Sequence, residues 1–227
     1  MPVEKIPLGI NGLDKMLGGG VPKNHHVLVA GGPGTGKTSF GMQYLMKGVE
    51  LGEKGVFITL EQKSERIIRD MEAAFNWDIR KAIDDGKLMV IDIDRYNFQH
   101  LMDVVQSCSV THKAKRIVID TLTMLRLFFK DDLEFRKGLF NLLDFLSSID
   151  ATAVITAEKP YSVREEVKFG LEEFVVDGVI MLYNMPKKNQ RIRALEVLKM
   201  RGTDHSQGMF PFQITKEGIV VLLEEVL

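Results

Sequence analysis

Eight residues between positions 31 and 38 combine glycines, a lysine and a hydroxyl in an order that suits phosphate binding. They read Gly-Gly-Pro-Gly-Thr-Gly-Lys-Thr and fit the pattern G-x-x-x-x-G-K-[ST]. Glycines let successive backbone N–H groups face a phosphate closely. We expect Lys37 to reach the β and γ phosphates of ATP and Thr38 to offer its hydroxyl to Mg²⁺. The residues predicted to contact the nucleotide in this segment are Gly32, Pro33, Gly34, Thr35, Gly36, Lys37, Thr38 and Ser39.

Hydrolysis of such a ligand needs a carboxylate near the metal and a base near the attacking water. Asp120 ends the apolar run Arg116–Asp120, and we expect Thr38 and Asp120 to form the Mg²⁺ site. Glu61 follows the run Gly55–Leu60 and is the best candidate base, a role that contributes about 10²–10⁴-fold. Taken alone, Asp120 also fits a strand-terminal cap, and Glu61 also fits a solvated loop residue.

Lys199 and Arg201 lie two positions apart in a predicted strand, so both side chains should leave the same face, opposite Met200. Such a pair suits charge developing on a γ-phosphate, and a cation supplied by a neighbouring subunit is worth about 10³–10⁵ in rate. The spacing by itself equally fits two solvated charges on an edge strand.

Alternating apolar runs and helix-like stretches must position these residues. The predicted strands are His26–Ala30, Gly55–Leu60, Lys87–Ile93, Arg116–Asp120 and Ala151–Ala157. The predicted helices include Thr38–Leu51, one capped by Ser64, one from Asn97 to Val110, and one that starts at Asp131 or Asp132. Apolar strands joined by helices predict an α/β fold, a mainly parallel twisted sheet with helices on both faces.

Beyond Gly178 the strands follow one another without helices. They are Gly178–Tyr183, Arg191–Lys199, Pro211–Thr215 and Gly218–Leu223, with turn residues at Asn184–Gln190. We expect an antiparallel C-terminal extension of the same sheet, in one domain that spans residues 1–227.

The composition sets limits on partners and location. The chain of 227 residues has 30 basic and 31 acidic side chains, so no basic excess points to nucleic acid. One cysteine, Cys108, no signal-like N-terminus and no membrane-length apolar run predict a cytoplasmic protein. His25 and His26 are interpreted as strand-edge residues, because no cysteine or carboxylate cluster accompanies them.

The sequence resembles RecA-fold P-loop ATPases and, within them, the KaiC-like proteins of archaea and bacteria. The resemblance covers nearly the whole chain. It is carried by GINGLDKMLGGGVP (9–22), GGPGTGKT (31–38), GVFITLEQ (55–62), NWDIRKAIDDGKL (76–88), RIVIDTLT (116–123), GLEEFVVDGVIML (170–182), ALEVLKMRGTDH (194–205) and FPFQITKEGI (210–219). The chain is similar to a single-domain member, whereas the protein that names the family carries two such domains in tandem.

The resemblance implies a RecA-like core and a homo-oligomeric ring, usually a hexamer, with ATP between subunits. It places Glu61 at the catalytic glutamate of the family. It also implies that Lys199 and Arg201, with His205, reach the ATP of a neighbour. The end of the segment Phe212–Ile219, for which Thr215 is the predicted contact residue, is implied to lie near the adenine. Many relatives have two adjacent glutamates where this chain has Glu61-Gln62.

Three functions compete at this point. The first is a slow ATPase that couples nucleotide state to ring assembly or to a protein partner. The second is a nucleotide-dependent binding module with little hydrolysis. The third is a recombinase-like DNA-binding protein, for which Thr121–Lys130 and Glu158–Lys168 occupy the places of the DNA loops, with Phe128 and Phe129 able to stack on bases.

Overall fold

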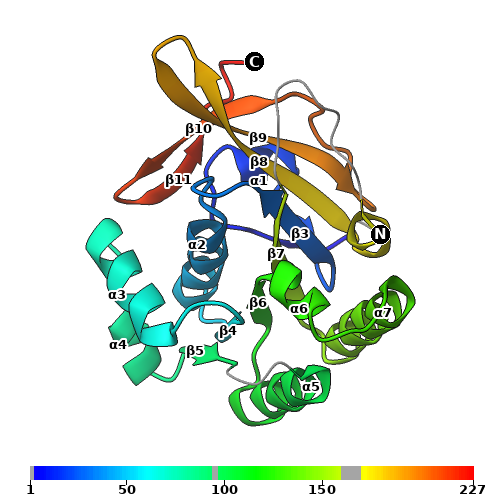
Figure 1. Ribbon diagram of the computed structural model, residues 1–227. Coiled ribbons are helices and arrows are strands. Elements are labelled where there is room, and N and C mark those ends of the chain that lie inside the picture. Colours follow the sequence, from blue (N-terminus) through cyan, green and yellow to red (C-terminus); the bar gives the residue numbers. More distant parts are fainter. Residues whose placement is uncertain (1–2, 94–96, 160–169) are drawn as a thin grey trace.

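The computed structural model describes residues 3–93, 97–159 and 170–227, and one large sheet organises them (Figure 1). Within these ranges nine strands pair in the order β11-β10-β9-β8-β3-β7-β6-β4-β5. Their bounds are β3 His26–Gly31, β4 Gly55–Thr59, β5 Leu88–Asp92, β6 Arg116–Asp120, β7 Thr152–Glu158, β8 Gly178–Lys187, β9 Gln190–Met200, β10 Phe210–Thr215 and β11 Gly218–Val221. The strands from β8 to β5 run parallel, and β9, β10 and β11 extend the sheet antiparallel.

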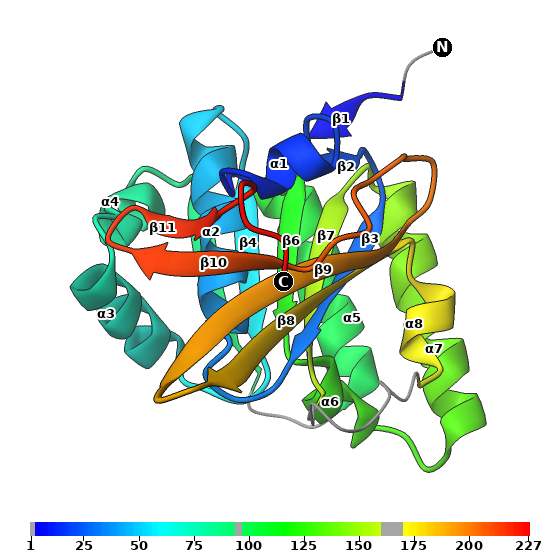
Figure 2. The ribbon, with the colours of Figure 1, turned by 90° about the horizontal axis from the view of Figure 1, so that it is seen from above.

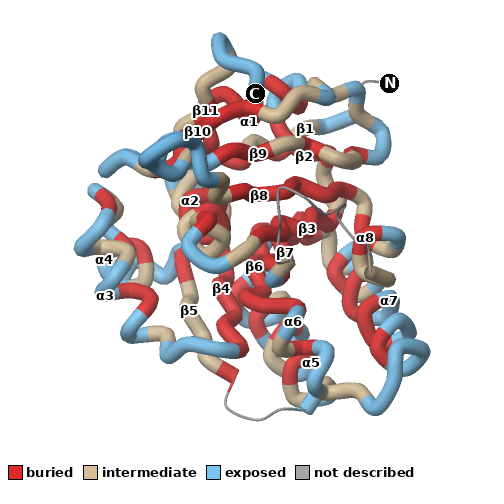
Figure 3. Tube along the Cα trace, turned by 45° about the horizontal axis from the view of Figure 1, so that its top comes forward, coloured by how far each residue is buried: buried red, intermediate tan, exposed pale blue. Residues whose placement is uncertain are grey.

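Helices cover both faces of the sheet (Figure 1). They are α2 Lys37–Glu50, α3 Ser64–Ala74, α4 Ile79–Asp84, α5 Phe98–Ser107, α6 Leu122–Arg126, α7 Asp132–Ser148 and α8 Glu172–Val175, with a π-helical turn at Cys108–His112 after α5. The core under α2, α3 and α4 is separate from the core under α5, α6 and α7. Strands β3, β4 and β6 are buried throughout because each has a helix layer on both sides (Figure 3). The predicted α/β class with helices on both faces is confirmed.

Local sequence signals explain several helix starts. Asn97 accepts hydrogen bonds from the backbone N–H groups of Gln99 and His100 at the start of α5. Asp131 accepts one from Glu134 N at the start of α7, as the sequence predicts. The prediction that Ser64 caps α3 is wrong. Ser64 is the first helical residue, and its hydroxyl donates to Asp92 Oδ1 at 2.7 Å instead.

The end of the chain differs in one respect from the prediction. Strand β8 pairs parallel with β3, so the antiparallel extension begins only at β9 (Figure 2). The segment Asn184–Gln190 is not a long turn, because β8 continues to Lys187 and β9 starts at Gln190. Lys188, with φ of 54°, reverses the chain in a tight hairpin.

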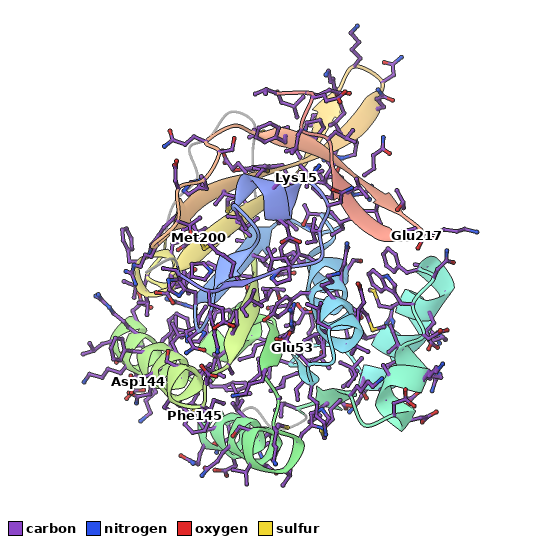
Figure 4. All side chains as sticks on the ribbon, turned by 180° about the vertical axis from the view of Figure 1, so that it is seen from behind. Lys15, Glu53, Asp144, Phe145, Met200 and Glu217 are labelled. Carbon is purple, nitrogen blue, oxygen red and sulfur yellow. The ribbon has the colours of Figure 1, made fainter. Side chains whose placement is uncertain are left out.

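The N-terminal segment closes one end of the sheet (Figure 2). Strands β1 Lys5–Ile6 and β2 Val21–Pro22 pair antiparallel around the short helix α1 Leu13–Met16. A buried arginine fastens this segment to the sheet: Arg116 Nη1 donates to Pro7 O at 2.7 Å, and its Nε donates to Glu53, labelled in Figure 4, at 2.6 Å. Among the described residues, no helix has the length and apolar character needed to cross a membrane.

Candidate nucleotide-binding site

The predicted phosphate loop joins the end of β3 to the start of α2. Gly34 and Gly36 have φ of 71° and 98°, a region that glycine enters without the steric cost other residues meet. A Cβ on Gly31 would lie 2.4 Å from Leu182 O of β8, so only glycine fits where the loop leaves the sheet. The loop therefore opens onto the N-terminus of a 14-residue helix, where backbone N–H groups and the helix dipole favour an anion.

Lys37, the first residue of α2, folds back over the loop. Its Nζ donates to Gly31 O at 2.9 Å and to Gly32 O at 3.0 Å. Burial lowers the pKa of Lys37, and the negative charges of Glu158, Asp120 and Glu61 oppose that shift. The ammonium is thus partly desolvated beside three carboxylates, a position that suits a phosphate oxygen.

Thr38 and Asp120 lie together, as the sequence predicts for a metal site. Thr38 Oγ1 donates to Asp120 Oδ2 at 3.0 Å, and Thr156 of β7 donates to Asp120 Oδ1. Burial raises the pKa of Asp120, while its bonds to Thr156 and Thr38 and the charge of Lys37 oppose the rise.

These groups fit Mg²⁺ on chemical grounds. The donor set consists of a hydroxyl and a carboxylate, and Mg²⁺ prefers oxygen ligands and keeps several waters. Next to Asp120, the buried Thr121 Oγ1 has no hydrogen-bond partner among the described residues, and it lines the same cavity. A water held by the metal would satisfy that hydroxyl.

Glu61 lies on the turn that follows β4. Thr59 fixes this turn, because its hydroxyl donates to Gln62 O at 2.9 Å and accepts from Gln62 N at 3.1 Å. The exposed Glu61 side chain lines the same cavity as the loop, and its charge acts on Lys37. Contrary to the expectation from the sequence, the strand before Glu61 does not lie next to the strand of the phosphate loop, because β7 and β6 separate β4 from β3.

One cavity of about 360 Å³ collects these predicted residues. Its lining comprises Pro33, Gly34, Gly36, Lys37, Thr38, Ser39, Glu61, Gln62, Met71, Asp120, Thr121 and Glu158. Ser39 turns toward α3, with its hydroxyl 3.9 Å from Met71 Sδ. Gly32 and Thr35 support the loop from within, since Thr35 Oγ1 donates to Gly32 O at 2.8 Å.

The cavity lining includes four residues that were not predicted as site residues, namely Gln62, Met71, Thr121 and Glu158, and Arg193 contacts the loop from β9. Glu158 ends β7 and faces the cavity beside Lys37 and Asp120. Arg193 of β9 donates from Nε to Gly34 O at 3.2 Å, so the β8–β9 hairpin touches the loop. A polar residue at the end of an apolar strand is a usable signal for Glu158, whereas Arg193 depends on the pairing of β9 with β8.

Lys199 and Arg201 lie far from the phosphate loop of their own chain. Lys199 pairs with Val179, which is level with Leu28, three residues and about 10 Å before Gly31 along β3. Both cations point the same way, toward α8, with Met200 (labelled in Figure 4) buried on the other side. The predicted shared face is present, but the structure does not bring this pair to the cavity around Lys37.

His205 and Thr215 are likewise outside the cavity lining. His205 Nδ1 lies 3.1 Å from Ser206 O, in the loop between β9 and β10. Thr215 belongs to the β10–β11 turn, where its hydroxyl donates to Gly218 O at 3.0 Å. The hairpin that carries Thr215 does reach the loop, because a Cβ on Gly36 would lie 3.1 Å from Ile214 Cδ1.

The aromatic residues considered for base stacking pack inward instead. Phe128 and Phe129 pack against the core under α5 and α7, and the ring of Phe129 lies 5.0 Å from that of Phe98. Arg126 pairs with Asp132 in the same region. Of the second segment considered for DNA, only Glu158 and Lys159 are within the described residues.

Comparisons with known proteins agree with this geometry. A family model described as "ATPase: KaiC" matches residues 6–226. Circadian clock oscillator protein KaiC from Prochlorococcus marinus subsp. pastoris is 38% identical over 232 residues, covering 97% of this chain and 45% of that protein. Circadian clock protein KaiC3 from Synechocystis is 36% identical, with 97% and 46% covered. The chain thus spans less than half the length of these curated relatives.

A solved structure gives the same result for the fold. The crystal structure of a KaiC-like protein from the hyperthermophilic archaeon Pyrococcus horikoshii OT3 has a TM-score of 0.87 and 36% identity, covering 97% of this chain and 100% of that one. The RecA-like P-loop architecture expected from the sequence is therefore confirmed. With a family model that matches nearly the whole chain, this protein belongs to the KaiC family of ATPases.

Proposed function

We propose that the chain is a slow Mg²⁺-dependent ATPase whose nucleotide state controls its assembly into a ring, expected to be a hexamer, or its binding to a protein partner. The observation that carries the proposal is the single cavity that brings Lys37, Thr38, Asp120 and Glu61 together from three elements. ATP is the substrate and ADP the product, and residues 1–227 act as one ATPase domain.

Each residue has a separate task in this reaction. The loop amides and Lys37 bind the β and γ phosphates, while Thr38 and Asp120 hold Mg²⁺. Mg²⁺, when bound, neutralises charge on the phosphate oxygens. Glu61 accepts a proton from the attacking water or orients it, and the exposed position of its side chain leaves room for that water.

Lys199 and Arg201 act on the ATP of a neighbouring copy. Their separation from the phosphate loop of their own chain supports this role. Lys199 lies level with Leu28, toward the start of β3, whereas the γ-phosphate would lie beyond the end of β3. An assembly in which the β9 end of one subunit meets the loop of the next supplies the pair in trans, with His205 and Thr215 completing the nucleotide contacts. Head-to-tail contacts of this kind close into a ring.

The sharpest test compares phosphate release by the unaltered protein and by Glu61→Gln, with ATP binding measured in parallel. Turnover should fall about 10²–10⁴-fold in Glu61→Gln while ATP still binds. Lys37→Ala is the control, since it should lose ATP binding itself. Assembly is followed by light scattering with ATP and with ADP, and Glu61→Gln should retain the ATP form.

A binding module with little hydrolysis is the second candidate, favoured by the glutamine at position 62 beside Glu61. The same measurement separates the two functions. Equally slow phosphate release by both proteins, with normal ATP binding, would establish the binding module and remove the ATPase.

A further inference from the structure

Lys199 and Arg201 are held by the backbone of the short helix α8 and the residues after it. Lys199 Nζ donates to Glu173 O at 3.1 Å and to Val176 O at 2.6 Å. Arg201 donates from Nη2 to Phe174 O at 3.2 Å and from Nη1 to Asp177 Oδ1 at 3.2 Å. The direction in which both cations leave β9 therefore depends on where α8 lies.

Helix α8 has four residues, too few to be stable without tertiary contacts. Its anchor is Glu173, which is 5% exposed although it carries a carboxylate. Glu173 Oε2 accepts from Gly170 N at 2.7 Å, and its Oε1 lies 2.9 Å from Lys159 Nζ. A buried carboxylate in a single-turn helix is costly unless it is paired, so this contact fixes the helix in place.

Lys159, the partner of Glu173, lies next to the nucleotide site. Lys159 follows Glu158 at the end of β7, and Lys159 N donates to Gly31 O at the start of the phosphate loop at 3.2 Å. Its ammonium also pairs with Glu172 at 3.1 Å. Burial lowers the pKa of Lys159, but the two carboxylates more than offset this and raise it overall. A continuous set of contacts thus runs from Gly31 through Lys159 and Glu173 to Lys199.

We propose that Glu173 is a positioning residue, which fixes α8 against Lys159 so that the carbonyls of α8 aim Lys199 and Arg201 at the ATP of the neighbouring subunit. This inference rests on the proposed function. Glu173 touches neither nucleotide nor water in this role. Its loss should impair the site of the neighbour and leave the loop, the metal pair and Glu61 of its own chain intact.

The test is a mixing experiment with Glu173→Gln and Glu61→Gln. Glu173→Gln keeps a side chain of the same size and an acceptor for Gly170 N but loses the charge that pairs with Lys159. Its kcat should fall about 10-fold or more, because small misplacements of charged groups have such effects. Glu172→Gln is the matched control: it also removes a charge that pairs with Lys159, but it leaves the buried Glu173 carboxylate bonded to Lys159 and Gly170 N, so its kcat should fall much less than that of Glu173→Gln.

Mixing the two slow variants should restore activity. Where a Glu173→Gln subunit supplies Glu61 and a Glu61→Gln subunit supplies well-placed Lys199 and Arg201, the shared site is complete. Random mixing of equal amounts in a head-to-tail ring makes about a quarter of the sites complete, so turnover should reach roughly that fraction of the unaltered protein. A structural defect in the Glu173→Gln subunit itself would give no recovery.

Arg201→Ala mixed with Glu61→Gln separates this inference from the proposed function. Recovery with Arg201→Ala but not with Glu173→Gln would overturn the role of Glu173 alone. No recovery in either mixture would overturn action in trans, and with it this inference, whereas the proposed ATPase is judged separately from phosphate release by the unaltered protein and by Glu61→Gln. Thermal unfolding checks that Glu173→Gln is folded. If it is not folded, Lys159→Met replaces it in the mixture with Glu61→Gln, and the same recovery of activity is expected. Failure of that mixture to recover activity would count against the inference.

Discussion

His26, the first residue of the strand that carries the phosphate loop, should make the protein less stable in mild acid. The side chain is 2% exposed, and burial lowers its pKa from 6.5 to about 4, against the opposing charge of Asp177. Ser147 Oγ donates to Leu143 O, an arrangement that favours the tautomer in which His26 Nε2 carries the hydrogen of the 2.9 Å bond to Ser147. His26 Nδ1 is then the basic nitrogen, and it is buried without a partner among the described residues.

The sign and size of the effect follow from these two pKa values. Between them the unfolded chain binds a proton that the folded chain does not, so stability falls as pH drops from 6.5 toward 4. At about pH 4.5 protonation of the histidine favours the unfolded state by a factor of roughly 50–100, which lowers the free energy of unfolding by about 2–3 kcal/mol relative to about pH 7.5. Above 6.5 the histidine is neutral in both states and contributes no pH dependence.

His26→Gln is the matched variant, because a glutamine amide donates to Ser147 Oγ but does not titrate. Urea unfolding of both proteins at about pH 7.5 and 4.5 gives the free energies, and acidic residues elsewhere contribute equally to each. The change in the free energy of unfolding between the two pH values should be smaller in His26→Gln by about 2–3 kcal/mol. Equal pH dependence in the two proteins would refute a buried neutral histidine at this position.

Three further changes test the site and its support. Gly48→Ala places a Cβ 2.4 Å from Arg116 Cδ, and the Arg116 guanidinium cannot move away because hydrogen bonds hold it. The free energy of unfolding in urea should therefore fall by about 1–3 kcal/mol, and this loss should disappear in an Arg116→Ala background. Asp120→Asn should lower ATP affinity about 10-fold or more in Mg²⁺ and little in EDTA by calorimetry; the same loss in both would speak against a metal role. Gln43→Ala removes an amide that accepts from Ile219 N at 2.6 Å and donates to Ile219 O at 3.2 Å. The free energy of unfolding in denaturant should fall by about 2–3 kcal/mol. An unchanged midpoint would contradict the view that Gln43 holds the β10–β11 hairpin against α2.

The phosphate loop and the parallel strands could be predicted because their signals are local. Gly34, Gly36 and Lys37 each act within eight residues of one another, and a strand buried on both faces reads as an unbroken apolar run. Asp120 and Glu61 followed from the same logic, since the carboxyl ends of parallel strands meet at one edge of a sheet. The structure places both in the cavity with Lys37.

The features that escaped prediction depend on pairing between distant segments. An apolar run looks the same whether it lies parallel or antiparallel to its neighbour, so the direction of β8 relative to β3 was not readable from its residues. The contact of Arg193 with Gly34 requires the β8–β9 register, and the burial of Glu173 requires Lys159. The hydroxyl of Ser64 prefers Asp92 to a cap because β5 brings that carboxylate beside α3.

The reversal between β8 and β9 determines how charge is distributed over the two edges of the sheet. Because β8 runs parallel to β3, its end lies beside the phosphate loop, and the hairpin brings Arg193 of β9 to that edge. Continuing along β9 then carries the chain back, so that Lys199 and Arg201 arrive at the edge where β3 begins. Strand β9 thus places Arg193 beside the phosphate loop of its own chain, and its other end, with the residue that follows it, places Lys199 and Arg201 at the opposite edge. Within one copy, Lys199 and Arg201 donate to carbonyls and a carboxylate around α8. In the proposed assembly, a neighbouring copy would bring the triphosphate that its own loop binds to these two cations.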